Sequence, residues 1–199
     1  MSYACVILAA GEGRRAGGCK PLMELCGATV IDRVLAAAAA AASRILVVGG
    51  CRFEELRAYL EARHPAVEVV CNAAWEDGMF SSVQAGLAGI ESPAFVHPAD
   101  VPGVGPDVYR ALAAAFEADP RPVVRPVFSG RRGHPVLLGS EAVAAVLEAP
   151  PGSSLRKVLA SLPGRYVTVD DGMVLRDFDT AADLEALRAD LGAWSRRGG

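Results

Sequence analysis

The sequence contains no extended basic run and no long apolar run. Its 199 residues are 52% hydrophobic and 22% charged, with a formal net charge of −3. A nucleic-acid surface needs clustered positive charge, so we expect no nucleic-acid partner. Residues 1–8 lack a basic segment ahead of an apolar stretch, and residues 34–42 are too short to span a bilayer. We therefore expect no signal peptide and no membrane association.

Paired cysteines are also missing. The five cysteines are an odd number, and none belongs to a C-x-x-C pair. This pattern argues against a disulfide framework and against a zinc site. Reduced thiols are typical of the cytoplasm, which is the compartment we expect.

What is present is an alternation of short apolar runs with helical stretches. We expect strands at residues 3–9, 45–48, 67–70, 95–96, 123–128, 136–138 and 166–169. We expect helices at residues 30–42, 53–63, 82–88, 109–118, 142–147, 155–159 and 181–191. The alternation predicts a single α/β domain over residues 1–199, with a mostly parallel sheet and a frayed tail at 191–199. Ligands of such sheets bind beyond the carboxyl ends of the strands.

The first predicted strand leads into a glycine-rich, basic loop. Leu8-Ala9-Ala10-Gly11 is followed by Gly13, Arg15 and Lys20. Glycines let backbone N–H groups approach phosphate oxygens, and the cations would neutralise a triphosphate. The loop is neither a Walker loop nor a complete G-x-G-x-x-G motif. The alternative is a surface turn with solvated arginines.

A second group of polar residues follows the strand at 67–70. It contains Asn72, Gly78, Ser81 and Ser82. Gly78 permits a tight backbone path, and the N–H groups and hydroxyls could bind a base or ribose. Taken alone, the pattern favours a simple N-cap by Ser81-Ser82 for the next helix.

Asp100 follows the strand at 95–96 in a loop stiffened by Pro98 and Pro102. A strand-end carboxylate suits Mg²⁺, which binds one or two carboxylates together with phosphate oxygens and water. The alternative is that Asp100 caps the helix after Pro106. We interpret His97 as a strand-end residue and not as a ligand.

Residues 125–135 combine arginine, glycine and histidine in a strand–loop–strand. Arg125, Arg131, Gly133 and His134 could bind a phosphate, because arginine forks match phosphate oxygens and glycine allows close approach. The alternative is a solvated hairpin tip.

Asp177 and Asp179 alternate before the last helix, so they share one side of an extended segment. Two like charges on one side are unfavourable without a nearby cation, and magnesium would serve. Thr180 and Asp183 form a pattern typical of a helix N-cap. The pattern does not decide which carboxylate reaches the metal.

Taken together and in this order, these motifs resemble the MobA-like NTP transferase family of the nucleotidyltransferase superfamily. Within it the chain is most similar to the molybdenum-cofactor cytidylyltransferase group. Ala16 departs from the family, which commonly has Met there. The resemblance implies a Rossmann-like, GT-A-like three-layer sandwich with a mostly parallel mixed sheet.

The resemblance also implies roles for individual residues. The catalytic residues would be Arg15, Lys20 and Asp100, and the metal ligands Asp100 with Asp177 or Asp179. The nucleotide-binding residues would be Leu8, Ala9, Ala10, Gly11, Gly13, Arg15, Lys20, Asn72, Gly78, Ser81 and Ser82. The acceptor-binding residues would be Arg125, Arg131, Gly133 and His134.

The implied reaction transfers a nucleoside monophosphate from an NTP to a phosphorylated small molecule, with Mg²⁺ as cofactor. CTP is the expected nucleotide and a molybdopterin-type cofactor the expected acceptor, with a molybdoenzyme as a further partner. CTP is favoured because the cytidylyltransferases of this group share the sequence Leu-Ala-Ala-Gly with this chain, whereas their guanylyltransferase relatives have glycine at the position of Ala10. The alternatives are another acceptor, such as a sugar phosphate or polyol phosphate, and a non-catalytic pterin-cofactor carrier.

Overall fold

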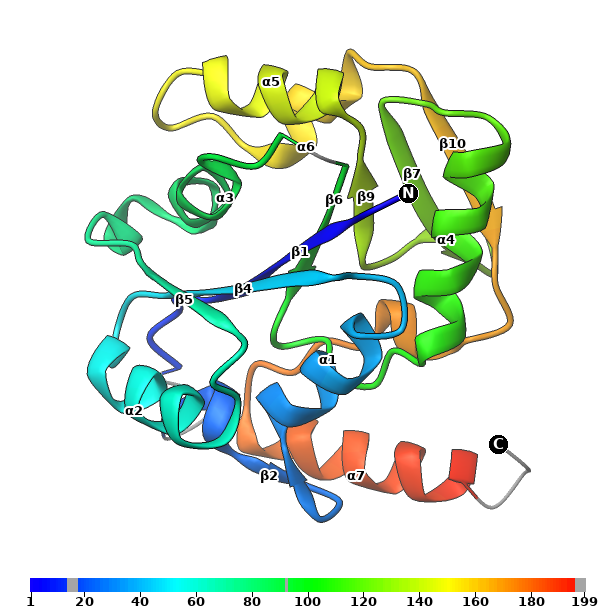
Figure 1. Ribbon diagram of the computed structural model, residues 1–199. Coiled ribbons are helices and arrows are strands. Elements are labelled where there is room, and N and C mark those ends of the chain that lie inside the picture. The colour runs from blue at the N-terminus through cyan, green and yellow to red at the C-terminus, as the bar shows by residue number, and fades with distance from the viewer. Residues whose placement is uncertain (14–17, 92, 196–199) are drawn as a thin grey trace.

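A mixed β-sheet runs through the middle of the protein (Figure 1). The computed structural model describes residues 1–13, 18–91 and 93–195. Within these residues the sheet has eight strands, in the order β10-β7-β9-β6-β1-β4-β5, with β8 paired to β7. The strands are β1 (Ala4–Ala9), β4 (Arg44–Gly49), β5 (Glu68–Cys71), β6 (Ala94–Pro98), β7 (Val123–Phe128), β8 (Arg131–Arg132), β9 (Val136–Leu138) and β10 (Gly164–Thr168). Strands β6, β1, β4 and β5 are parallel neighbours, as are β7 and β10, whereas β9 and β8 run antiparallel to their partners.

Helices cover both faces of this sheet. On one face lie α1 (Val30–Ala38), α2 (Phe53–Arg63) and α4 (Pro106–Ala118). On the other lie α3 (Met79–Leu87), α5 (Ser140–Glu148) and α6 (Leu155–Ala160). The predicted three-layer α/β sandwich with a mostly parallel mixed sheet is therefore confirmed.

Strand β1 shows how the sequence builds the two cores. Successive side chains of a strand point to opposite faces. Cys5 and Ile7 pack beneath α1 and α4, whereas Val6 and Leu8 pack beneath α3. Because both faces are covered, β1 is apolar at every position, as expected for a central parallel strand.

A smaller hydrophobic cluster joins the C-terminal helix to an N-terminal hairpin. Strands β2 (Glu24–Leu25) and β3 (Ala28–Thr29) form the hairpin, and α7 (Ala181–Ser195) packs beside it (Figure 1). Leu25, Phe178 and Leu187 are the fully buried centre of this contact. The packing brings the segment before α7 next to the loop that follows β1.

Several element boundaries differ from those expected. Helix α1 ends at Ala38, not at residue 42, because the following turns lead the chain into β4. Helix α3 begins at Met79, three residues early, and α7 is helical to Ser195, beyond residue 191 where the tail was expected to begin. Three 3₁₀ helices were not predicted: η2 (Lys20–Leu22), η3 (Trp75–Asp77) and η4 (Gly172–Leu175).

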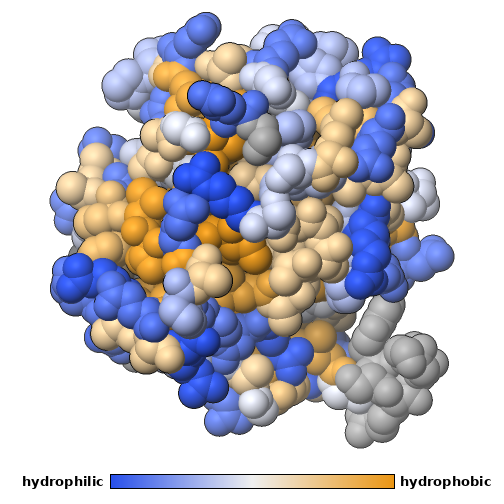
Figure 2. Space-filling model, viewed as in Figure 1, coloured by the Kyte–Doolittle hydropathy of each residue, from blue (hydrophilic) through white to orange (hydrophobic). Residues whose placement is uncertain are grey.

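The surface carries apolar and polar regions side by side. Figure 2 shows hydrophobic residues gathered around β4 and β5, between α2 and α3, with hydrophilic residues around them. No helix in the described part of the chain combines the length and apolarity that a membrane crossing requires.

Candidate active site

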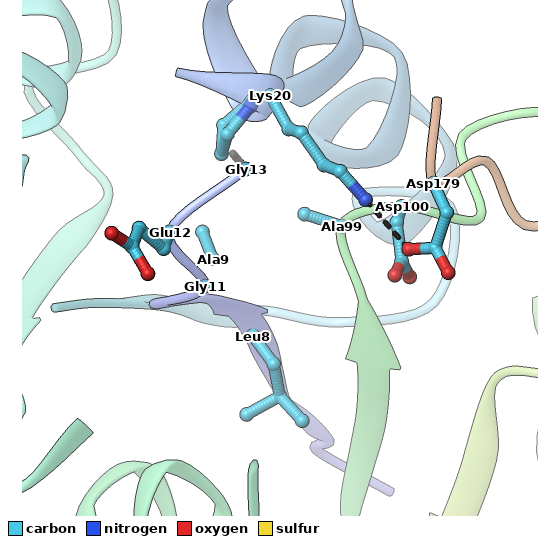
Figure 3. A pocket seen from close by; sticks show the side chains of 10 residues that line it. Leu8, Ala9, Gly11, Glu12, Gly13, Lys20, Ala99, Asp100 and Asp179 are labelled. Atoms are coloured by element: carbon cyan, nitrogen blue, oxygen red, sulfur yellow. Dashed lines mark hydrogen bonds and ion pairs between the residues drawn. The ribbon is translucent and has the colours of Figure 1, made fainter. Parts of the chain in front are cut away.

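A pocket of about 370 Å³ lies at the carboxyl ends of β1 and β6 (Figure 3). Strand β1 and the following loop supply one wall, and the loop after β6 supplies another. The lining residues are Leu8, Ala9, Gly11, Glu12, Gly13, Lys20, Pro21, Ala99, Asp100 and Asp179. The predicted phosphate loop and two predicted metal ligands thus meet in one cavity. Arg15, predicted to bind the triphosphate, lies outside the described residues.

Lys20 joins the phosphate loop to the segment before α7. It begins η2, and its Nζ donates to the Phe178 carbonyl at 2.8 Å and to Asp179 Oδ1 at 2.9 Å. The ammonium also lies 5.2 Å from the centroid of the Phe178 ring. The Lys20 side chain is only 17% exposed, so its charge is directed into the pocket and not toward bulk solvent.

Backbone hydrogen bonds hold Asp100 in a tight turn at the end of β6. The Val101 N–H donates to the Pro98 carbonyl at 3.1 Å, and the Ala99 N–H donates to the Leu8 carbonyl at 2.9 Å. The Phe178 N–H donates to the carbonyl of Asp100 itself at 3.1 Å. The three bonds tie Asp100 to its own strand, to β1 and to the segment that carries Asp179.

Asp100 does not cap the following helix, which was the alternative interpretation. The N-cap residue of α4 is Gly105, which makes no side-chain cap bond. The Gly105 N–H instead donates to Asp171 Oδ2 at 2.9 Å. No motif in the sequence had indicated a role for Asp171.

The electrostatics of the pocket favour an additional cation. Burial raises the pKa of Asp100, and the nearby charges of Asp177 and Asp179 raise it further, whereas Lys20 lowers it. Within the described residues, no three His, Cys, Asp or Glu side chains form a ready-made metal cluster. A pair of carboxylates that supplies only part of the coordination is what Mg²⁺ uses when phosphate oxygens and water complete its shell. The donor set therefore fits a divalent cation that arrives with a nucleotide.

The Asn72 group forms a closed hydrogen-bond network. Asn72 Nδ2 donates to the hydroxyls of Ser81 and Ser82 at 2.8 and 2.9 Å, and its Oδ1 accepts from the Ala74 N–H. Both serines lie inside α3, whose N-cap is Gly78 with φ of 100°, so the alternative interpretation of Ser81-Ser82 as the N-cap is wrong. These side chains brace the turn before α3, and they do not line the pocket of Lys20 and Asp100.

Ala10 does not line that pocket, although its neighbours Ala9 and Gly11 do. It is 6% exposed. A Cβ atom built on Gly50 would come within 2.9 Å of the Ala10 Cβ, and closer still to Trp75. The Ala10 methyl group therefore packs beside Gly50 and Trp75.

A second, larger cavity of about 1120 Å³ lies between α3, α6 and the strands β7 to β10. Three of the four predicted acceptor residues, Arg125, Arg131 and His134, line it. Gly78, predicted for the nucleotide, lies here as well. Arg132, Arg156 and Tyr166, which the sequence analysis did not assign, add two further cations and an aromatic ring.

Arg132 and Tyr166 form one wall of this cavity. The Arg132 guanidinium lies 4.6 Å from the centroid of the Tyr166 ring, and that ring is 51% exposed. Burial and the neighbouring Arg132 lower the pKa of Arg125. Clustered arginines are costly without an anion, so the second cavity suits an anionic ligand.

His134 is buried at one end of the cavity. Burial and the charge of Arg125 lower its pKa to about 4, against a smaller raising effect of Asp177. Its Nδ1 is buried and has no hydrogen-bond partner among the described residues. Gly133 does not line the cavity; a Cβ there would lie 2.5 Å from the Val174 carbonyl oxygen, so only glycine fits.

Residues 171–179 connect the two cavities, and we call them the linking segment. The Asp171 carboxylate of this segment accepts a hydrogen bond from the Gly105 N–H, which follows the Asp100 turn in the chain. The Val174 carbonyl of the segment accepts a hydrogen bond from the His134 N–H at 2.9 Å. Its end carries Asp179 in the smaller cavity. The signal for this role in the sequence is weak, because η4 is a single turn without periodicity.

The fold and this pair of cavities are those of a nucleotidyltransferase: a glycine-rich loop, a lysine, a carboxylate at a strand end and a carboxylate before the last helix line one cavity, beside a separate basic cavity. Residues 5–167 match the MobA-like NTP transferase domain, and the chain belongs to that family.

Individual relatives agree with this assignment. The molybdenum cofactor cytidylyltransferase of Escherichia coli (strain K12) is 24% identical over 181 residues, 90% of this chain and 92% of that protein. A nucleotidyl transferase from Methanothermobacter superposes with a TM-score of 0.81 at 21% identity, covering 97% of this chain and 99% of that one. Rv0371c from Mycobacterium tuberculosis H37Rv in complex with manganese superposes with a TM-score of 0.76 at 22% identity, covering 95% and 99%.

Proposed function

We propose that the protein transfers CMP from CTP to the phosphate of a molybdopterin-type cofactor and releases pyrophosphate, with Mg²⁺ as cofactor. The observation that carries the proposal is the meeting of Lys20, Asp100 and Asp179 with the glycine-rich loop in one pocket, beside a basic cavity. The relative in E. coli, a molybdenum cofactor cytidylyltransferase, supports the choice of CTP and of the acceptor.

The reaction forms one bond and breaks one. An acceptor phosphate oxygen attacks the α-phosphorus of CTP, and the bond from that phosphorus to the bridging oxygen of pyrophosphate breaks. Positioning and charge neutralisation supply most of the rate enhancement in such reactions. In this proposal Gly11 and Gly13 present N–H groups to the triphosphate, with Lys20 and Arg15 as its cations. No general base is needed, because an acceptor phosphate is already an anion.

Asp100 and Asp179 would hold the Mg²⁺, because both line the smaller pocket. The ion would neutralise charge on the triphosphate. Asp177 influences both Asp100 and His134 electrostatically and lies outside the lining of either cavity. We assign Asp177 to the boundary between the two cavities.

Mn²⁺ binding can decide whether Asp177 or Asp179 is the second metal ligand. Asp179→Asn should weaken Mn²⁺ binding about tenfold or more, whereas Asp177→Asn should change it by less than about threefold. Electron paramagnetic resonance of free Mn²⁺ in a titration would measure both. The reverse order would transfer the ligand role to Asp177.

The acceptor would bind in the larger cavity. Arg125 and Arg131 provide charge for its phosphate, and neutral His134 can supply a hydrogen bond from its unpartnered ring nitrogen. Arg131→Ala should raise the acceptor KM about tenfold and leave the CTP KM within about twofold. Loss of CTP binding with normal acceptor binding would reverse the layout of the two sites.

The same site could use a sugar phosphate or polyol phosphate instead, or could carry a pterin cofactor without chemistry. Pyrophosphate release should be measured for CTP, GTP, ATP and UTP, each with molybdopterin-type cofactor and with sugar phosphates. Turnover confined to CTP and the pterin supports the proposal. Turnover only with a sugar phosphate replaces the acceptor, and pterin binding without pyrophosphate release from any NTP identifies a carrier.

A further inference from the structure

His97 is a buried polar residue for which the reaction described above has no role. It lies in β6, three residues before Asp100, and is 1% exposed. Its Nε2 lies 2.9 Å from the Val101 carbonyl oxygen, and its Nδ1 is hydrogen-bonded to the hydroxyl of Tyr109 on α4. Both ring nitrogens therefore have partners, and one partner is the residue directly after Asp100.

The directions of these hydrogen bonds follow from the groups involved. A carbonyl oxygen only accepts, so Nε2 of His97 carries the proton and donates to Val101. Because burial lowers the His97 pKa to about 3, the ring is neutral and Nδ1 must accept from the Tyr109 hydroxyl. The chain of hydrogen bonds therefore runs from the Tyr109 hydroxyl through the His97 ring to the Val101 carbonyl.

We infer that His97 is a positioning residue, which holds the turn of residues 98–101 so that the Asp100 carboxylate stays directed into the nucleotide pocket. Backbone bonds fix the front of this turn to β1 and fix Asp100 to Phe178. The imidazole holds the last residue of the turn through its hydrogen bond to the Val101 carbonyl. A strand-end carboxylate needs such support because a small displacement of a ligand weakens a metal site.

The inference rests on the proposed function for the metal-binding role of Asp100, but its tests need neither CTP nor an acceptor. The first test is the tautomer of His97 in the full-length protein, read from long-range ¹H–¹⁵N correlation spectra. We expect a protonated Nε2 and an unprotonated Nδ1, unchanged between about pH 5 and pH 8. A neutral ring with the proton on Nδ1 and none on Nε2 would leave no donor for the Val101 carbonyl and overturn the inference.

The second test is Mn²⁺ binding, followed by the electron paramagnetic resonance of the free ion. His97→Phe keeps a planar ring and loses both nitrogens, and we expect the Mn²⁺ dissociation constant to rise about tenfold. His97→Gln places an amide N–H₂ close to the Nε2 position and should recover most of the affinity. Tyr109→Phe leaves Nδ1 without its donor, so we expect an intermediate loss together with a mixture of His97 tautomers.

Tyr3→Phe is the matched control. Tyr3 and Tyr109 both pack against Phe95 in the same core, and the Tyr3 hydroxyl bonds to Ala113 and Glu117, away from the Asp100 turn. It should lower stability without changing Mn²⁺ affinity. Equal Mn²⁺ affinity in wild type, His97→Phe and Tyr3→Phe overturns the positioning role and leaves the proposed reaction untouched. Conversely, a protein whose variants respond as expected but which never transfers CMP disproves the reaction and leaves the role of His97 intact.

Discussion

Lys20 would have different partners in the free protein and in the protein with a bound nucleotide. Its Nζ bonds to Asp179 and to the Phe178 carbonyl, and it lines the pocket in which we place the triphosphate. Asp179 is also a proposed metal ligand. The ion pair between them is therefore an interaction that an incoming nucleotide and Mg²⁺ would rearrange.

Lys20→Ala should lower kcat/KM for CTP about 100-fold, which is the usual loss when a group that stabilises developing charge is removed. The KM of the acceptor should change by less than about threefold, because we place the acceptor in the other cavity. Steady-state kinetics with each substrate varied will measure both. Lys157→Ala is the control, since Lys157 lines neither cavity and is the only other lysine of the chain. An effect confined to the acceptor KM would move Lys20 out of the triphosphate site.

Ala10 is a position where the sequence and the structure lead to different expectations. The resemblance makes it the residue that selects CTP over GTP, whereas its methyl group packs beside Gly50 and Trp75. Ala10→Gly should therefore lower the Tm and leave the ratio of kcat/KM for CTP and GTP within about threefold, since Ala10 does not line the pocket. A methyl group that touched the base would be worth about 1–3 kcal/mol, or roughly 10- to 200-fold. A change of the ratio by tenfold or more would show that Ala10 does face the base.

The sequence predicted which residues would meet in the smaller pocket, because they follow parallel strands whose carboxyl ends lie together. This applies to Gly11 and Gly13 after β1 and to Asp100 after β6. It could not predict that Asn72, Ser81 and Ser82 bond to one another, because hydrogen-bond partners within a turn depend on its geometry. For the same reason it missed Arg132 and Tyr166, whose stacking joins β8 to β10.

At the scale of elements, strands and helices with a clear apolar pattern were predicted closely. The helix Phe53–Arg63 and the strands Val123–Phe128 and Val136–Leu138 have the expected bounds. The hairpin β2–β3 and the turn η4 are too short to show any periodicity. Their positions come from tertiary contacts, chiefly those of Leu25 and Val174 with residues distant in the sequence.

The position of the linking segment, residues 171–179, depends on hydrogen bonds to the Asp171 carboxylate. Its two carboxylate oxygens accept separately from the Gly105 and Met173 N–H groups, both at 2.9 Å. Asp171→Asn retains one acceptor and should lower the free energy of unfolding by about 1 kcal/mol. Because the segment contacts both cavities, the apparent Mg²⁺ constant and the acceptor KM should rise together. Kinetics and urea unfolding should be compared with Asp170→Asn, which changes an exposed neighbour; a rise in only one constant would show that the segment does not couple the cavities.

The two cavities of the molecule share one sheet, and the linking segment has contacts with residues of both. The His134 N–H donates to the Val174 carbonyl of that segment, and the Phe178 N–H of the segment donates to the Asp100 carbonyl. Both contacts pass through backbone groups, so they persist through most single substitutions. In the proposed reaction the two substrates would approach a common boundary, and Asp177 affects the pKa values of Asp100 in one cavity and His134 in the other.

Two neutral histidines in this framework make the whole fold sensitive to acid. Burial lowers the pKa of His97 to about 3 and that of His134 to about 4, from an ordinary value of 6.5. Below 6.5 the unfolded chain binds protons that the native protein does not, so this contribution to stability is complete above about pH 6.5 and is lost as the pH falls toward the native values. Between about pH 7 and pH 5 each histidine should lower the free energy of unfolding by about 2 kcal/mol, because one pH unit corresponds to about 1.4 kcal/mol.

Urea unfolding at the two pH values measures this difference in the free energy of unfolding. His97→Gln and His134→Gln should each reduce it, and Tyr3→Phe should leave it unchanged because the pKa of Tyr3, raised to about 12, lies far outside this range. A wild-type protein that is equally stable at both pH values would show that these histidines take up protons in the native state as they do in the unfolded chain.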